Sequence, residues 1–76
     1  MQTIHVILAD DHAVVRSGIR MFLENAVDIT VVGEAEDGEQ AKLLIAEHKP
    51  DVAIVDIKMP KATGLEVTRW AQEQPP

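Results

Sequence analysis

Three aspartates stand at positions where a folded chain could use them to bind a cation. Asp10 and Asp11 follow the apolar run "VILA", and Asp56 follows the apolar run "VAIV". Carboxylate oxygens are the ligands that hard divalent cations prefer in proteins. An aspartate that interrupts an apolar run also needs a partner, because burying an unpaired charge is costly. The value of this pattern depends on whether the fold brings the three carboxylates together.

The apolar pattern predicts strands that alternate with helices. Short β-branched runs predict strands at 3–9, 29–35 and 52–57, and helical spacing predicts helices from residue 12, over 38–48 and after residue 63. The expected caps are Asp11 for the first helix, Asp37 with Gln40 for the second, and Thr63 with Glu66 for the third. This alternation indicates βαβ units and a parallel sheet of the α/β class.

Apolar residues recur at helical spacing in the first and last predicted helices. They are Val15, Ile19, Phe22 and Leu23 in the first helix, and Leu65, Val67, Trp70 and Ala71 in the last. Such residues form the face of a helix that packs on a sheet.

In a parallel sheet all carboxyl ends lie at one edge, so Asp10, Asp11 and Asp56 would share it. If the first and third strands are neighbours, their backbones are about 4.8 Å apart, which lets the three carboxylates surround one small cation. Oxygen ligands that leave room for several waters suit Mg²⁺ better than Ca²⁺. The alternatives are that Asp11 only caps a helix and that the aspartate pair is a solvated loop.

Composition limits the classes of function. The 76 residues, 46% hydrophobic and 26% charged, predict one domain over 1–76, and a net charge of -6 disfavours binding to nucleic acid or anionic membranes. No cysteine is present, so disulfides and thiolate zinc sites are excluded. The apolar runs are far shorter than the roughly 20 residues of a membrane span, so a cytoplasmic location is expected.

Several motifs resemble the receiver domain of two-component response regulators. They are "ILADDH", "VDIKMP" with Met59 and Pro60 after Asp56, and "TGLEV" at the start of the third helix. The stretch "DDHAVVRSGIRMFLE" resembles the NarL/LuxR (FixJ-like) subfamily, whose receivers precede a DNA-binding helix-turn-helix output domain that regulates transcription. The resemblance implies a three-layer, doubly wound, flavodoxin-like sheet with strand order 2-1-3. The first helix would lie on one face and the other two on the opposite face.

The resemblance also implies a role for each residue of the acidic cluster. Asp56 matches the phosphoacceptor, which takes a phosphoryl group from the phosphohistidine of a sensor histidine kinase or from a small acyl phosphate. Asp11, Asp56 and the backbone carbonyl of Lys58 match the ligands of Mg²⁺, and Asp10 matches an acid that acts through a metal-bound water. Neither Lys58 nor Lys61 matches the family's phosphate-facing lysine, so both are expected to be solvated.

The chain resembles only the first three of the family's five βα units. It is therefore expected to be a shortened or proteolysed receiver in which the third strand presents an unpaired apolar edge. Such an edge recruits other chains, so self-association through this edge or by exchanged elements is expected. Phosphotransfer is expected to be impaired, because the family's switch hydroxyl and phosphate-facing lysine match no residue here.

Two other functions compete with the receiver. A Mg²⁺-dependent phosphohydrolase with an aspartate nucleophile usually has a second carboxylate two residues later, and this chain has Lys58 there. A non-phosphorylated interaction module would keep the acidic cluster without using it.

Overall fold

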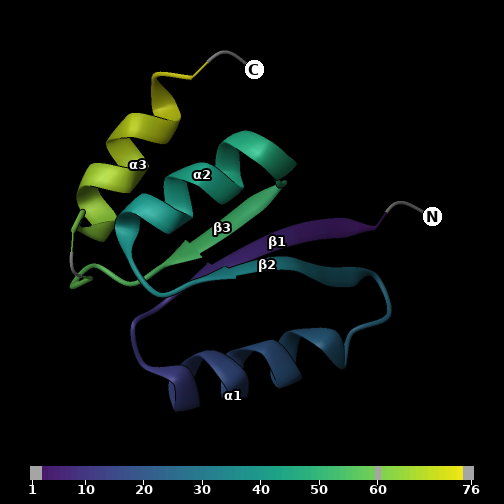
Figure 1. Cartoon of the computed structure of the whole chain (residues 1–76). Helices are drawn as coiled ribbons and strands as arrows, with labels where there is room; N and C mark the ends of the chain where they lie inside the picture. Colours follow the sequence, from purple (N-terminus) through teal and green to yellow (C-terminus); the bar gives the residue numbers. More distant parts are fainter. Residues whose placement is uncertain (1–2, 60, 75–76) are drawn as a thin grey trace.

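A computed structural model describes residues 3–59 and 61–74 as one parallel sheet with helices on both faces (Figure 1). The elements are, in chain order, β1 (Ile4–Ala9), α1 (Ala13–Glu24), β2 (Ile29–Ala35), α2 (Gly38–His48), β3 (Val52–Val55) and α3 (Gly64–Gln72). The strand order is β2-β1-β3, with α1 against one face and α2 and α3 against the other. The predicted fold class and strand order are confirmed. Pro60, a residue of the "VDIKMP" motif, lies outside the described residues.

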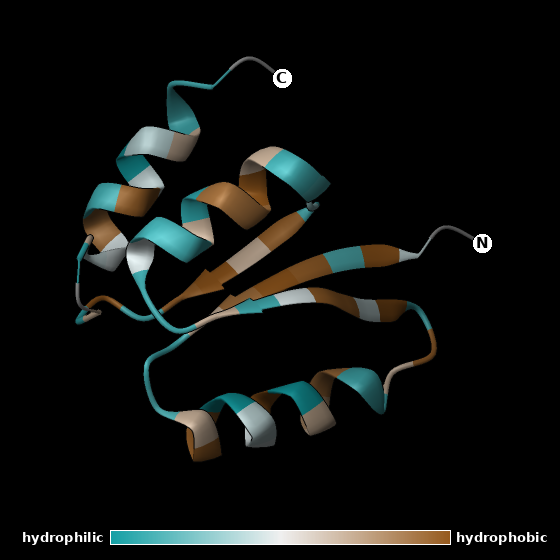
Figure 2. Ribbon diagram, viewed as in Figure 1, coloured by the Kyte–Doolittle hydropathy of each residue, from teal (hydrophilic) through white to brown (hydrophobic). Residues whose placement is uncertain are grey.

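The central strand β1 supplies the core of the sheet. Its residues Val6, Ile7, Leu8 and Ala9 are each at most 3% exposed, because helices cover both faces and neighbouring strands cover both edges. A second group packs between the sheet and the two helices α2 and α3, and it comprises Ala9, Ala35, Ala41, Met59, Ala62 and Val67. Figure 2 shows that β1 and β3 are largely hydrophobic and lie between helices of mixed polarity.

Two of the three predicted helix caps are confirmed. The Asp37 carboxylate accepts a hydrogen bond of 2.8 Å from the Gln40 N–H, and Thr63 Oγ1 accepts one of 3.2 Å from the Glu66 N–H. The prediction that Asp11 caps α1 is wrong, because the capping position is His12. Instead, the Asp10 carboxylate accepts a hydrogen bond of 2.8 Å from the His12 N–H. The turn that this bond closes places Asp11 before the start of the helix.

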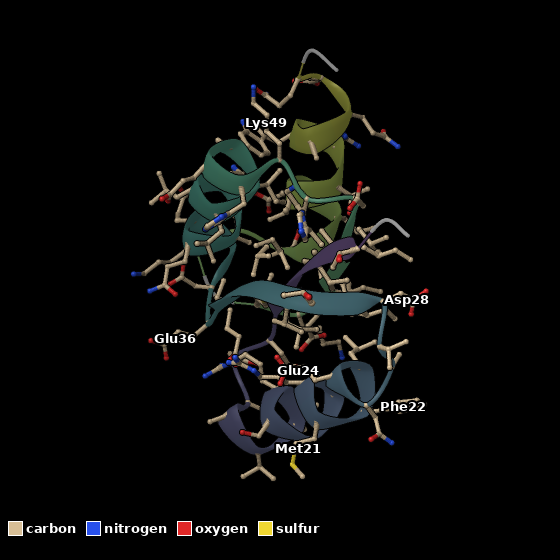
Figure 3. The ribbon with its side chains drawn as sticks, turned by 90° about the vertical axis from the view of Figure 1, so that its right-hand side faces the viewer. Met21, Phe22, Glu24, Asp28, Glu36 and Lys49 are labelled. Carbon is tan, nitrogen blue, oxygen red and sulfur yellow. The ribbon has the colours of Figure 1, made fainter. Side chains whose placement is uncertain are left out.

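The predicted apolar faces of α1 and α3 are only partly correct. Val67 is buried and Ile19 is half-buried, but Phe22 and Leu65 are 72% and 68% exposed. In Figure 3, Met21 projects from the side of α1 opposite the sheet. Only a narrow face of each helix contacts the rest of the fold. Apolar residues on either side of that face therefore remain exposed to solvent.

Strand β3 forms an exposed edge within the described part of the chain. It pairs with β1 from Val6↔Val52 to Ala9↔Val55, and its Val52 and Ile54 side chains are 46% and 37% exposed. The predicted apolar edge is confirmed. The strand is shorter than predicted, since it ends at Val55 and the chain turns at Asp56, whose carboxylate accepts from the Lys58 N–H.

The start of α3 is held against the backbone that follows β3. The Gly64 N–H donates to the Ile57 carbonyl at 3.0 Å, and a Cβ at Gly64 would lie 2.8 Å from the Asp56 carbonyl carbon. Only glycine permits this approach, because real Cβ atoms do not come so close. Gly64 therefore fixes the distance between α3 and Asp56.

We expect Gly64→Ala to lower the free energy of unfolding by about 1–3 kcal/mol, the usual cost of overpacking. The control is Gly18→Ala in α1, where an added Cβ has nothing within 4 Å. That substitution should raise the free energy of unfolding by about 0.5–1 kcal/mol, because alanine favours a helix interior. Urea unfolding of the three proteins at one fixed concentration measures both changes. Equal effects of the two substitutions would contradict the assigned contact.

Candidate functional site

The carboxyl ends of β1 and β3 bring four ionisable side chains into one cluster. Asp10, Asp11, His12 and Asp56 each offer a ligand atom, and these atoms lie within 4.8 Å of one another. Asp10 and Asp56 are half-buried, whereas Asp11 and His12 are exposed. The expectation that the three aspartates share one edge of the sheet is confirmed.

Backbone hydrogen bonds of the sheet place these residues. The Asp56 N–H donates to the Ala9 carbonyl at 2.9 Å, and the Asp10 N–H donates to the Ala35 carbonyl at 3.0 Å. The parallel ladder thus continues into the site itself. Asp10 and Asp56 directly follow the last residues of β1 and β3. Their side chains therefore lie at the end of the packed sheet, where solvent and ligands can reach them.

His12 belongs to the cluster, although sequence reasoning assigned it no role. Its Nδ1 lies 3.0 Å from Asp10 Oδ1 and 3.0 Å from Asp11 Oδ1. The hydrogen bond with Asp10, followed by the charge of Asp11, raises the pKa of the His12 imidazole above its ordinary value. A protonated His12 offsets part of the negative charge of the aspartates. Its position directly after the pair was the signal that could have found it.

The backbone after β3 orients the Asp56 carboxylate. Asp56 Oδ1 accepts a hydrogen bond of 3.2 Å from the Lys58 N–H, which closes a tight turn over two residues. The Lys58 residue is exposed, as predicted. The role of its carbonyl as a metal ligand remains a prediction.

The prediction that Lys61 is a solvated surface lysine is confirmed, since its side chain is 67% exposed, but the lysine also makes an ion pair that the sequence did not reveal. Lys61 Nζ lies 3.5 Å from Oδ2 of Asp37, which is only 6% exposed. The hydrogen bond from the Gln40 N–H and, to a smaller extent, the charge of Lys61 lower the pKa of the Asp37 carboxyl, against the opposing effect of its burial. The loop that follows Asp56 is thereby tied to the start of α2.

A cavity of about 170 Å³ opens between α1 and the carboxyl ends of β1 and β3. Its lining combines apolar strand residues, two of the clustered aspartates and one arginine, namely Leu8, Ala9, Asp10, Arg16, Ile19, Ile54, Val55 and Asp56. The cavity places an apolar wall beside Asp56. Arg16 is a second site residue that sequence reasoning missed.

The donor set fits a hard divalent cation. Three carboxylates offer oxygen atoms that lie close together, and Asp11 and His12 are exposed, which leaves space for water at the cluster. Such a set suits Mg²⁺, which keeps several waters and binds through few carboxylates. A carboxylate held in such a cluster can also act as the nucleophile toward a phosphoryl group, because a cation and positioning supply most of the catalysis of phosphoryl transfer.

Comparison with known protein families shows to which family the chain belongs. Residues 6–76 match the response regulator receiver domain family. The chain belongs to this family. The matched residues include both parts of the cluster, Asp10 to His12 and Asp56.

Individual relatives agree with this assignment. The chain is 44% identical to the transcriptional regulatory protein YhcZ of Bacillus subtilis over 93% of its own length and 33% of that protein. It is 47% identical to the response regulator GacA of Pseudomonas protegens over 87% of its length and 31% of that protein. The chain therefore spans about a third of the length of the curated relatives it matches.

Solved receiver structures superpose closely on this fold. The signal receiver domain of the response regulator NarL from Mycobacterium tuberculosis gives a TM-score of 0.93 at 38% identity, covering 95% of this chain and 58% of that one. A LuxR-family DNA-binding response regulator from Staphylococcus aureus gives 0.87 at 31% identity, covering 92% and 58%. The predicted similarity to the NarL/LuxR subfamily is confirmed.

The helices of the described residues are not candidates for crossing a bilayer, since none combines the necessary length with the necessary apolar character.

Proposed function

We propose that this chain is the phosphoacceptor part of a two-component response regulator and that Asp56 accepts the phosphoryl group. The observation that supports this most directly is the meeting of Asp10, Asp11 and Asp56 at the carboxyl ends of two adjacent parallel strands. Ligands of open α/β sheets bind at this edge. Family membership supports the same assignment.

In this proposal Asp11, Asp56 and the Lys58 carbonyl hold Mg²⁺, and Asp10 acts through a metal-bound water. When bound, Mg²⁺ neutralises charge on the phosphoryl oxygens. An Asp56 carboxylate oxygen forms the new bond to phosphorus as the bond from phosphorus to the donor breaks. The donor is the phosphohistidine nitrogen of a sensor histidine kinase or the acyl oxygen of a small acyl phosphate, and it departs with the electron pair of the broken bond.

The partners and setting of the parent protein follow from the relatives rather than from this chain's geometry. Its relatives are transcriptional regulatory proteins, and one is described as a DNA-binding response regulator. We infer that phosphorylation controls a helix-turn-helix output domain in the parent, in the cytoplasm. The net charge of -6 makes this segment itself a poor ligand for nucleic acid or membranes.

The exposed edge of β3 supports self-association as a further property. Val52 and Ile54 present apolar side chains beside backbone groups that pair with no further strand among residues 3–59 and 61–74, an arrangement that natural sheets usually cover. A second copy that adds its own β3 would satisfy these groups. Such pairing gives a symmetric contact, because the same segment serves both chains.

We expect the chain to bind Mg²⁺ and Asp56→Asn to weaken that binding at least tenfold, because it removes a charged ligand. Asp28→Asn is the control, since Asp28 directly precedes β2 and so lies at the amino ends of the strands, opposite the cluster. Isothermal titration calorimetry measures each dissociation constant. A wild-type chain without Mg²⁺ binding, or equal losses in the two variants, would contradict the proposed site.

Phosphotransfer is tested on the same proteins by incubation with acetyl phosphate and Mg²⁺, followed by intact mass. We expect a minor fraction of the wild type to gain one phosphoryl group and Asp56→Asn to gain none. Modification of Asp56→Asn would refute the phosphoacceptor assignment. Stoichiometric modification of the wild type would refute the expected impairment.

Self-association is expected to depend on β3. Val52→Lys should shift the chain to a monomer, because a lysine on an edge strand must be desolvated when the edge pairs. Val27→Lys makes the same change at a side chain that is 94% exposed and lies outside β3, so it should leave association unchanged. Sedimentation velocity over a dilution series measures both. A cooperatively folded wild-type monomer at every concentration would overturn the proposal.

A further inference from the structure

Arg16 joins α1 to the backbone of the acidic cluster. Its Nη1 donates a hydrogen bond of 2.6 Å to the Asp10 carbonyl, and its Nε donates one of 3.0 Å to Glu34 Oε1. The Arg16 and Glu34 side chains are 17% and 26% exposed. Arg16 also lines the cavity beside Asp10 and Asp56. These contacts link three elements, α1, β1 and β2, at the site.

The Asp10 carbonyl lies just past the last rung of the ladder that joins β1 to β3. The preceding carbonyl, that of Ala9, accepts from the Asp56 N–H, and the Asp10 carbonyl accepts from Arg16. This carbonyl belongs to the peptide plane that joins Asp10 to Asp11. Because a peptide unit is planar, holding its oxygen also restrains the direction in which both aspartate side chains leave the backbone.

Glu34 reaches Arg16 because of an irregularity in β2. The pairing of β1 with β2 shifts between Val6↔Val31 and Ile7↔Gly33, which inserts one extra residue. Beyond this bulge, Gly33 lies against Leu44 of α2 and Ala35 joins the core below α2. Glu34, between them, therefore faces α1. Bulges commonly redirect a side chain in this way near functional sites.

The charges of this network balance within it. Glu34 accepts from Arg16 and also from Arg20, and Arg20 Nε donates to Glu24 Oε1 at 3.3 Å. Two arginines thus meet two glutamates, so little of the positive charge of Arg16 is left for the aspartates. Arg16 therefore affects the cluster mainly through geometry. Its planar guanidinium group donates to two acceptors at once and so holds them in fixed relative positions.

We propose that Arg16, oriented by Glu34, is a positioning residue that sets the spacing of the Asp10 and Asp11 carboxylates for a small divalent cation. This inference rests on the proposed Mg²⁺ site. Mg²⁺ requires near-ideal octahedral geometry at short distances, whereas Ca²⁺ accepts longer and more variable ones. Greater freedom of the Asp10–Asp11 peptide should therefore weaken the binding of Mg²⁺ more than the binding of Ca²⁺.

The test compares Mg²⁺ and Ca²⁺ affinities of the wild-type chain with those of Arg16→Lys, Arg16→Gln and Glu34→Gln by calorimetry. Arg16→Lys keeps the charge and loses the fork. We expect each Arg16 variant to lower the affinity for Mg²⁺ about 10-fold, which is within the range seen when residues that orient metal ligands are replaced. Each variant should also lower the preference for Mg²⁺ over Ca²⁺. Glu34→Gln should act in the same direction with a smaller effect. Arg69→Lys, an exposed arginine of α3, is the matched control and should change neither affinity.

Urea unfolding of each metal-free variant separates positioning from general destabilisation. If Arg16 has a purely structural role, the affinities for both cations should fall in proportion to the loss of stability. This result would overturn the inference. Full recovery of wild-type affinities in Arg16→Lys would overturn it as well, since charge alone would then suffice. If the Arg16 variants do not fold, Glu34→Gln decides the question with Arg16 in place. A wild-type chain that binds neither cation would instead refute the proposed metal site and, with it, this inference.

Discussion

The parallel pairing of β3 with β1 is the constraint on which the site depends. This pairing makes the Asp56 N–H donate to the Ala9 carbonyl, one residue before Asp10. Residues separated by more than 40 positions in the sequence then begin their loops from adjacent strand ends. Without that rung of the ladder, the two halves of the acidic cluster would be independent surface carboxylates, which have no reason to bind a cation tightly.

Several contacts around this pairing limit the freedom of the loops. Gly64 brings α3 against the backbone of Asp56, Lys61 ties the same loop to Asp37, and Arg16 holds the carbonyl of Asp10. Each contact joins a functional loop to a helix that is itself packed or capped. The site is thus built at the carboxyl ends of a packed sheet. Backbone contacts hold its mutually repelling carboxylates together, and His12, when protonated, offsets part of their charge.

The elements and the shared edge of the three aspartates could be predicted from the sequence, because apolar periodicity and cap residues are local signals. Asp37 with Gln40 and Thr63 with Glu66 are examples in which side-chain chemistry alone marks the helix start. The strand order came from the resemblance to receivers. Contacts that cross elements were missed for a physical reason. Arg16 meets Glu34 only because of the bulge in β2, and Lys61 meets Asp37 only through the loop after β3.

The exposure of Phe22 and Leu65 shows a different limit of sequence reasoning. Helical spacing indicates which residues share a face, but the width of the contact depends on how the helix lies on the sheet. The same reasoning placed Asp11 at the helix cap because aspartate favours that position in general. Here the Asp10 carboxylate bonds the His12 N–H, and Asp11 contributes to the cluster instead.

The central claim is that one cation is shared by the ends of β1 and β3, and paramagnetic broadening by Mn²⁺, used in place of Mg²⁺, tests it most directly. In amide NMR spectra with substoichiometric Mn²⁺, the account predicts simultaneous loss of the signals of residues 10–12 and 56–58. The signals of Asp28 and Asp51, acids at the opposite ends of the strands, should persist. Broadening confined to one of the two loops, or spread evenly over all acidic residues, would contradict the account.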